Sequence, residues 1–323
     1  MKTKLFFLAI LFSFSFSNVN AQCPSGDVQL FSQAEVDAFV NTYPNCTHIT
    51  GNLIFGEHIN GGGPNDINDI TGFENLSKID GYLGVFFSDI VSLDGMQNLQ
   101  ELGSLNLVYN DFLQSIEEMI NITELNNGQL QIGYNPSLQS LEGLNNIQEI
   151  SGRLYLGENN SLNSLEGLNN LVSVGESANI GYTKFTNLNE LNKLESIGER
   201  LIIWNNTNLT NIEGLSNLTF LGESISIGEN PILTSLNGIH NFPISIEGEF
   251  GLRLESNNSL SHCNLPNICE YLSFDPTEYP REITENTGNC LDEQAVLAAC
   301  GLSISDMEND SANWNVHYQK NTG

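Results

Sequence analysis

Three glutamates that recur at one place in a repeated segment are the acidic residues best arranged to do chemistry. The segment SLEGLNN occurs at residues 140–146 and again at 164–170, so Glu142 and Glu166 share one column with Glu213 of a related copy. Clustered carboxylates can bind a calcium ion or act as general acid and base in polysaccharide hydrolysis. Because these glutamates recur with the repeat, we interpret them as solvated turn residues. Calcium is kept as an alternative ligand, and no enzyme activity is predicted.

The histidines and cysteines do not form a catalytic or metal-binding pattern. The histidines occupy unrelated positions in the repeat: His48, His58, His240, His262 and His317. A zinc site made of His262, Cys263 and Cys269 is an alternative, but an even number of cysteines near the chain ends favours disulfides. The sequence therefore predicts no catalytic residue, no metal site and no cofactor.

Aromatic residues recur just before an asparagine that ends a short apolar segment. The segment has the form L-x-L-x-x-N-x-x-L, as in LNLVYNDFL (105–113) and LQIGYNPSL (130–138). Its alternating apolar residues predict a strand with one buried face, so the aromatics lie on the outward face. Rings beside glycines there would leave their faces free to stack on a sugar or a peptide. The candidate ligand-binding residues are Phe86, Phe87, Tyr109, Tyr134, Tyr155, Tyr182 and Trp204.

A repeat of 23–25 residues positions these candidates. A turn motif such as ITGFENL (70–76), LEGLNNI (141–147) or LNGIHNF (236–242) occurs eight times, and each copy precedes one strand segment. Stacked copies bring equivalent strands side by side at about 4.8 Å and bury the leucines between them. The sequence therefore predicts an all-β fold, a right-handed parallel β-solenoid of about eight leucine-rich coils with short helical, disulfide-pinned caps.

The asparagine that ends each strand segment has a structural explanation. Asparagine tolerates left-handed backbone, bonds to nearby main chain, and can hydrogen-bond to a copy of itself in the next coil. This predicts a ladder of Asn110, Asn135, Asn159, Asn206, Asn230 and Asn257, with Ser88 and Thr183 in the two remaining coils. The motif glycines, such as Gly143, are interpreted as turn positions that admit no side chain.

The first 21 residues have the features of a secretory signal peptide. Lys2 and Lys4 precede the apolar run LFFLAILFSFSF (5–16), and Ala21 suits a signal-peptidase site. The run is too short to span a membrane, and no later segment is apolar enough, so we expect no membrane insertion of the mature chain. That chain carries 8 basic and 39 acidic residues, a net charge of 8 − 39 = −31, which opposes nucleic-acid binding. We expect the protein to be secreted or displayed at the cell surface.

The six cysteines lie only near the ends of the mature chain. Cys23 pairs with Cys46 if the ends do not meet, and the last four cysteines allow three pairings, of which Cys263–Cys290 with Cys269–Cys300 is favoured. The expected organisation is a signal peptide (1–21), an N-terminal cap and first coil (22–69), leucine-rich repeats (70–262), a cysteine-containing C-terminal cap (263–301) and a polar tail (302–323).

The L-x-L-x-x-N-x-x-L units between cysteine-containing ends resemble leucine-rich repeats, and more closely the receptor L-domain-like β-solenoids of exported bacterial proteins and growth-factor receptor ectodomains. The resemblance covers about residues 23–300 and implies binding, adhesion or recognition. We therefore expect an exported module that binds an extracellular protein or glycan through its aromatic strand face. The alternatives are a structural spacer, whose rings only pack on one another as cross-strand pairs, and a carbohydrate-active β-solenoid enzyme. The oligomeric state stays open.

Overall fold

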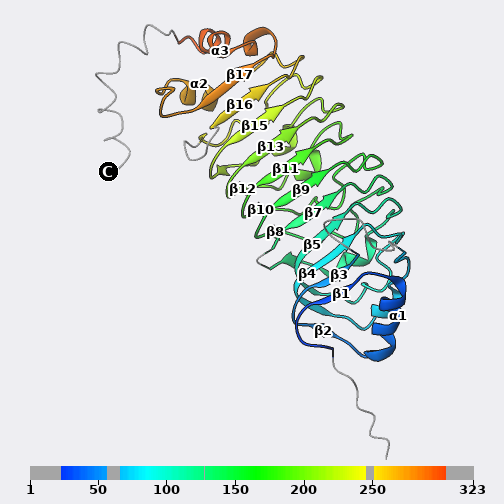
Figure 1. Ribbon diagram of the computed structural model, residues 1–323. Helices are drawn as coiled ribbons and strands as arrows, with labels where there is room; N and C mark the ends of the chain where they lie inside the picture. The colour runs from blue at the N-terminus through cyan, green and yellow to red at the C-terminus, as the bar shows by residue number, and fades with distance from the viewer. Residues whose placement is uncertain (1–22, 57–65, 127, 245–250, 303–323) are drawn as a thin grey trace, which may run out of the picture.

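The computed structural model describes residues 23–56, 66–126, 128–244 and 251–302. The predicted signal peptide, nearly all of the predicted tail, and His58 and His317 lie outside these residues. Within the described part, the chain forms one long parallel sheet of 17 strands with few helices (Figure 1). The predicted all-β, parallel solenoid is therefore confirmed.

The main strands of successive coils pair side by side along the whole body. The pairing is parallel and in register: Leu130 lies beside Leu154, and Leu154 lies beside Ala178. Because the side-chain period of a strand is two residues, this register points the first and third residues of the central strands into the core. The main strands are β1 (Val28–Leu30), β3 (Leu53–Phe55), β4 (Lys78–Phe86), β5 (Glu101–Val108), β7 (Leu130–Gly133), β9 (Leu154–Gly157), β11 (Ala178–Gly181), β13 (Leu201–Trp204), β15 (Ile225–Gly228), β16 (Leu252–Glu255) and β17 (Arg281–Thr284).

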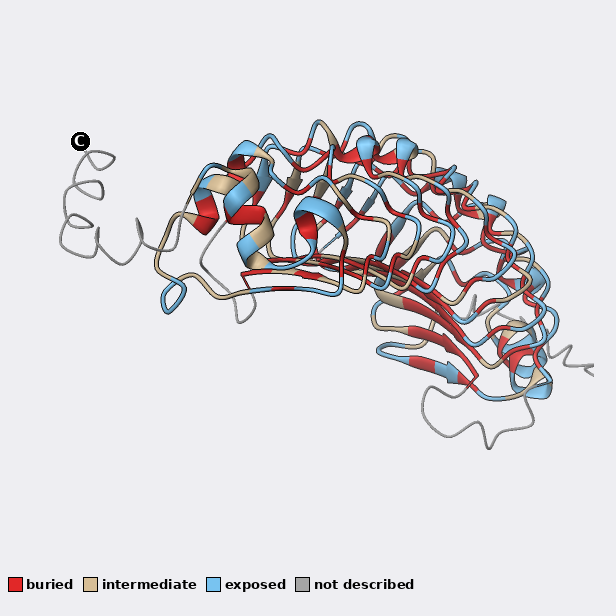
Figure 2. Ribbon diagram, turned by 90° about the horizontal axis from the view of Figure 1, so that it is seen from above, coloured by how far each residue is buried: buried red, intermediate tan, exposed pale blue. Residues whose placement is uncertain are grey.

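A second row of short strands precedes the main strands from β3 to β15, and β4 and β5 are long enough to take part in both rows. The other members of this row are β2 (His48–Ile49), β6 (Glu124–Leu125), β8 (Glu149–Ile150), β10 (Ser173–Val174), β12 (Ser196–Ile197) and β14 (Phe220–Leu221). Short 3-10 helices turn several coils: η1 (Thr71–Phe73), η2 (Glu117–Asn121), η3 (Asn189–Leu191) and η4 (Glu213–Leu215). The body bends, with the main strands along the inner side (Figure 2). The side chains of the main strands that point away from the core therefore form a surface on the inner side of this bend. We call this surface the inner face.

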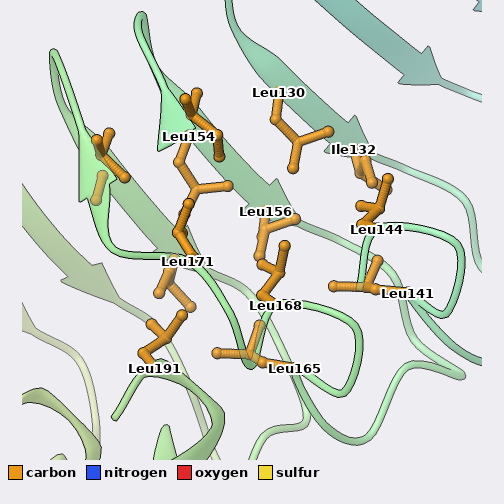
Figure 3. Packing of buried hydrophobic residues seen from close by; sticks show 14 of the residues in the cluster. Leu130, Ile132, Leu141, Leu144, Leu154, Leu156, Leu165, Leu168, Leu171 and Leu191 are labelled. Carbon is orange, nitrogen blue, oxygen red and sulfur yellow. The ribbon is translucent and has the colours of Figure 1, made fainter. Parts of the chain in front are cut away.

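Leucines from strands and turns meet in a continuous column inside the coils. Leu154 and Leu156 of β9 pack with Leu165 and Leu168 of the turn that follows, and all four side chains are fully buried (Figure 3). One coil cannot enclose these side chains alone, so each coil is covered by its neighbours. The repeated SLEGLNN segment is therefore a unit of the scaffold.

The strand-end asparagines form a buried hydrogen-bonded ladder. Oδ1 of Asn159 accepts from the backbone N–H of Asn135 (3.0 Å) and from its Nδ2 (3.2 Å). Nδ2 of Asn159 donates to the carbonyl of Ile132 in the preceding coil (2.9 Å). The same side chain-to-side chain contact joins Asn110 to Asn135, Asn206 to Asn230, and Asn230 to Asn257. Each amide thus satisfies main-chain and side-chain groups of the neighbouring coil that would otherwise be buried without a partner.

Three other positions alter or extend the ladder. The hydroxyls of Ser88 and Thr183 donate to Oδ1 of Asn110 (2.8 Å) and Asn206 (2.6 Å), so each replaces one asparagine contact. Asn286, which the repeat pattern did not identify, accepts from the backbone N–H of Asn257 (3.0 Å). The ladder therefore continues past the last recognisable repeat.

A second series of asparagines, also not recognised from the sequence, ties the turns together. Nδ2 of Asn146, the last residue of SLEGLNN, donates to the carbonyl of Ile120 in the preceding coil (2.7 Å). The asparagines that make the equivalent contact are Asn98, Asn121, Asn170, Asn217 and Asn241. These asparagines all occupy the same position in the turn motif, and that shared position could have identified them from the sequence.

Gly143 shows why the turn motif contains glycine. Its φ is +107°, and a Cβ atom there would overlap the carbonyl oxygen of Ile116 in the preceding coil. Both conditions exclude other residues from this turn geometry. Where Glu118 and Glu190 replace the glycine, the chain forms the 3-10 helices η2 and η3, as it also does around Gly72 and Gly214, and none of these four residues has a positive φ.

The N-terminal end of the solenoid is covered by a helix and a disulfide. In α1 (Gln33–Thr42), the Ser32 hydroxyl accepts from the backbone N–H of Glu35 (3.4 Å), and the Glu35 carboxylate accepts from the N–H of Phe31 (2.6 Å). The arrangement resembles a capping box, except that the glutamate bonds to the residue before the N-cap and not to the N-cap itself. The disulfide Cys23–Cys46 links the chain on either side of the helix.

The C-terminal end contains α2 (Pro266–Leu272), η5 (Gly288–Cys290) and α3 (Glu293–Ala299). The disulfides there are Cys263–Cys290 and Cys269–Cys300, the pairing favoured from the sequence. These bonds use both cysteines of the alternative zinc site, which is therefore excluded. Strand β17 pairs with β16, so the sheet runs on into the segment assigned to the cap.

Candidate functional site

The inner face displays the second and fourth residues of the central main strands. Tyr155 is the second residue of β9, and Trp204 is the fourth residue of β13. Both are half-buried, whereas the first and third residues of these strands are fully buried in the core. The predicted strand pattern therefore puts these two aromatic residues on the surface opposite the leucines.

The residue that follows each main strand from β4 onward has a left-handed backbone. Nine consecutive coils place a non-glycine residue there, with φ between 49° and 62°. The asparagines were expected to have this left-handed conformation, and that expectation is wrong: the left-handed residue lies one position earlier, and each asparagine points back into the body. We call these nine residues the rim: Phe87, Tyr109, Tyr134, Glu158, Tyr182, Asn205, Glu229, Ser256 and Glu285.

The aromatic residues at the N-terminal end of the rim stack on one another. The ring centroids of Phe87 and Tyr109 are 4.7 Å apart with planes inclined by 10°, and those of Tyr109 and Tyr134 are 4.4 Å apart at 19°. Stacked rings engage each other's faces, as expected for cross-strand pairs. Tyr109 therefore has neighbours on both faces and presents its edge to the surroundings, contrary to the expectation that ring faces are free.

Three rim tyrosines are nevertheless well exposed. The exposed fractions are 41% for Tyr109, 38% for Tyr134 and 48% for Tyr182. Tyr182 stacks on no other ring among the residues that the structure describes. The rim therefore combines a ring stack with a separate, more exposed tyrosine two coils beyond its end.

Tyr155 lies flat across the inner face beside the stack. Ideal Cβ atoms built on Gly133 and Gly157 would come within 2.9 Å of its ring and its hydroxyl, respectively. The two glycines thus make room for the ring over the neighbouring strand β7 and over the end of its own strand β9. Burial raises the pKa of Tyr155 to about 12, and the proximity of Tyr134 and Glu158 contributes in the same direction.

Trp204 forms a second group with two arginines that the sequence analysis did not consider. Its ring lies over Gly228, and the Arg253 guanidinium carbon is 4.9 Å from the ring centroid, a cation–π contact. Arg253 also pairs with Glu255 and with Glu282 (Nε–Oε2 3.1 Å). A shallow pocket of about 230 Å³ lies here, lined by Arg200, Ile202, Trp204, Ser224, Ser226 and Arg253.

Phe86 does not belong to the exposed site. Its exposed fraction is 1%, and it packs with Ile54 and Val108 in a small cluster joined by Tyr82 and Phe87. The rings of Phe86 and Tyr82 both lie over Gly84, so neighbouring side chains cover Phe86 although its position in the strand points outward. The prediction that Phe86 is available to a ligand is therefore wrong.

The structure brings Phe87, Tyr109, Tyr134 and Tyr155 into one cluster and adds Glu158, which sequence analysis had not singled out. Burial raises the pKa of the Tyr134 hydroxyl, and the neighbouring Tyr109 and Glu158 raise it further. Glu158 occupies the same position in the repeat as the rim tyrosines, and that position could have identified it from the sequence as a neighbour of Tyr134.

No metal-binding arrangement accompanies these aromatics in the described part of the chain. No group of three or more His, Cys, Asp or Glu side chains there could hold a metal ion. Glu142, Glu166 and Glu213 are exposed turn residues, separate from the inner face. Of the helices that the structure describes, none has the length and apolar character of a membrane span.

Residues 45–131 match the receptor L domain. The matched segment runs from β2 into β7 and includes the first two residues of the rim, Phe87 and Tyr109. Beyond residue 131 the strands continue in the same parallel register, so the part matched and the rest form one solenoid. No curated protein matches the chain. Receptor L domains are non-enzymatic modules that bind protein ligands, and both this match and the disulfides are typical of extracellular proteins.

Proposed function

We propose that the mature chain is an exported recognition or adhesion module that binds an extracellular protein or glycan through its inner face and rim. The observation that carries the proposal is the alignment of three exposed tyrosines, Tyr109, Tyr134 and Tyr182, on one rim of the sheet. Tyrosine supplies a large contact area and a polar hydroxyl at low cost in conformational entropy, which suits it to interfaces. The receptor L domain match to residues 45–131 supports a ligand-binding role.

Export is part of the same proposal. The segment 1–21 has the sequence of a secretory signal peptide, and the three disulfides at the solenoid ends suit an oxidising compartment. We propose that the protein is secreted or held at the cell surface.

A structural spacer is the second candidate, and one observation favours it. The Phe87–Tyr109–Tyr134 stack supports neighbouring strands, which a spacer would also require. The stack does not account for Tyr182, which gains nothing from such pairing and is the most exposed of the three rim tyrosines. We therefore place recognition ahead of the spacer.

The test is a binding screen of the mature chain against glycans and extracellular proteins, with calcium present and removed. For each ligand found, the double variant Tyr134→Ala, Trp204→Ala should weaken binding about tenfold or more, as expected for aromatic anchors of an interface. The matched control is Phe112→Ala, Phe220→Ala, which removes two exposed rings that belong to neither the rim nor the main strands.

Unchanged affinity of the Tyr134→Ala, Trp204→Ala variant for every ligand would contradict the placement of the site. Absence of specific binding would favour the spacer, and release of a sugar product would favour a carbohydrate-active enzyme. Circular dichroism of both double variants checks that the solenoid is intact.

A further inference from the structure

The ring stack of the rim ends at one particular acidic residue. Tyr134, Glu158 and Tyr182 occupy equivalent positions on three consecutive coils, with φ of 57°, 58° and 54°. Backbone bonds join each of the first two to the next coil: the Tyr134 N–H donates to the carbonyl of Gly157, the residue before Glu158 (3.1 Å), and the Glu158 N–H donates to the carbonyl of Tyr182 itself (3.2 Å). Glu158 thus lies between two exposed tyrosines, each about 4.8 Å away along the sheet.

Each tyrosine has a ring face that the stack does not use. Tyr109 covers one face of Tyr134 at 4.4 Å, and no second ring stacks on Tyr134 among the described residues. Tyr182 has no ring neighbour of this kind on either side in the described part of the chain. The gap between the two tyrosines is therefore bordered by aromatic surface and contains the Glu158 side chain.

Glu158 differs from the other acidic rim residues in its contacts. Glu229 accepts a hydrogen bond from Nδ2 of Asn205 (2.8 Å), and Glu285 accepts one from the Ser256 hydroxyl (2.7 Å). The Glu158 carboxylate takes part in no hydrogen bond or ion pair with the residues that the structure describes, although it is only half-exposed. A carboxylate can only accept hydrogen bonds, so a partner for it must be a donor.

The negative charge of the protein indicates which kind of hydrogen-bond donor would bind to the Glu158 carboxylate. None of the nine rim residues is basic, and the mature chain has a net charge of −31. A lysine or arginine side chain can place its cation over a tyrosine face and donate to a carboxylate at the same time. A sugar hydroxyl can donate to the carboxylate but gains nothing from the negative field of the protein.

We propose that Tyr134, Glu158 and Tyr182 form a seat for a lysine or arginine side chain of a basic extracellular protein. The seat deepens the proposed function, on which it rests, by naming the chemistry of the partner. The inner-face residue Tyr155, whose hydroxyl lies over Gly157, borders the seat on the side of the sheet.

The test uses the mature chain with ring-labelled tyrosine, and its NMR signals are assigned through single Tyr→Phe variants. The probe is a hexalysine peptide at 0.15 M salt, where charges further apart than about 8 Å are largely screened. The same peptide with all lysines acetylated is the neutral control. The proposal expects the ring signals of Tyr134 and Tyr182 to shift with hexalysine and not with the acetylated peptide.

Two variants with the same change in charge distinguish binding at the seat from nonspecific electrostatic attraction of the peptide to the acidic protein. Glu158→Gln should weaken hexalysine binding about fivefold or more, because it removes the charge-assisted contact. Glu142→Gln changes an exposed glutamate on an outer turn and should alter binding less than about twofold. Equal losses in the two variants, or shifts spread over all tyrosines, would overturn the seat. Equal melting temperatures of the two variants show that the fold is retained.

The outcomes also separate the seat from the proposed function. If Glu158→Gln leaves hexalysine binding unchanged while Tyr134→Ala, Trp204→Ala abolishes binding of a glycan or a non-basic protein, the seat is wrong and the proposed function stands. If hexalysine binding depends on Glu158 and basic proteins are the ligands recovered in the screen, the seat is supported.

Discussion

The asparagine ladder can be tested by replacing Asn159 with leucine. This substitution keeps the size of the side chain and removes all three of its hydrogen bonds. The carbonyl of Ile132 and the backbone N–H of Asn135 lose their hydrogen bonds to this side chain, and Nδ2 of Asn135 keeps only its bond to the carbonyl of Leu107 (2.9 Å). All three belong to the interior of the neighbouring coils, where Asn135 is fully buried.

The expected loss follows from the number of orphaned groups. A buried polar group without a partner costs about 1–3 kcal/mol. Two such groups, together with the one bond that Nδ2 of Asn135 loses, cost about 3 kcal/mol, because the surrounding coils can relax and the individual costs do not add fully.

The assay combines urea unfolding with hydrogen exchange of the Asn135 backbone N–H. A loss of about 3 kcal/mol should accelerate exchange of that amide about a hundredfold if it exchanges through opening of this part of the solenoid. The matched control is Asn160→Leu, the same change at the next residue, which is exposed. If Asn159→Leu and Asn160→Leu have the same unfolding midpoint and the same Asn135 exchange rate, the ladder does not stabilise the solenoid.

Two further predictions concern buried phenols and the turn glycine. Burial raises the pKa of both Tyr155 and Tyr271 to about 12, so an absorbance titration should show tyrosines that ionise near pH 12, and Tyr155→Phe should remove one of them. Because these pKa values lie above the ordinary value of about 10, the phenols contribute their full stability below pH 10 and lose it as the pH rises towards 12; a late-ionising fraction unchanged in Tyr155→Phe would contradict this. Gly143→Ala should lower the free energy of unfolding by about 2–4 kcal/mol, because the new Cβ meets the Ile116 carbonyl in a backbone conformation with φ +107°. Gly301→Ala, where φ is also positive but no atom lies within 4 Å of the Cβ, should cost less in the same urea titration, and equal losses would show that the contact with Ile116 is unimportant.

The sequence alone specified the coil and its stacking. Leu154 and Leu156 alternate with outward residues, and the same pattern returns 24 residues earlier at Leu130 and Ile132. With such a short period, the leucines can be buried only against the next coil. The local sequence pattern therefore predicts the global fold. The end-of-strand asparagines were recognisable for the same reason, because each lies at the same place in every coil.

The candidate site was predictable only in part. The column that contains Tyr134 and Tyr182 could be read from the repeat, since equal phase means neighbouring positions on the sheet. Ring orientation could not be read in this way, because it depends on which side chains lie beside a ring in the two adjacent coils. Phe86 has an outward phase but is buried by Ile54 and Val108, which come from the coils on either side of it.

The tertiary structure also decided details that no single coil contains. The left-handed residue lies before each asparagine and interrupts the alternation of the strand, which would otherwise point the rim residue inward and the asparagine outward. The unpartnered carboxylate of Glu158 becomes visible only when Glu229 and Glu285 are seen to bond with their neighbours. Periodicity in the sequence thus determined the scaffold, since each coil repeats one set of backbone positions. The contacts across the 4.8 Å step between coils, where neighbouring residues differ, determined which aromatic and acidic groups remain available to a partner.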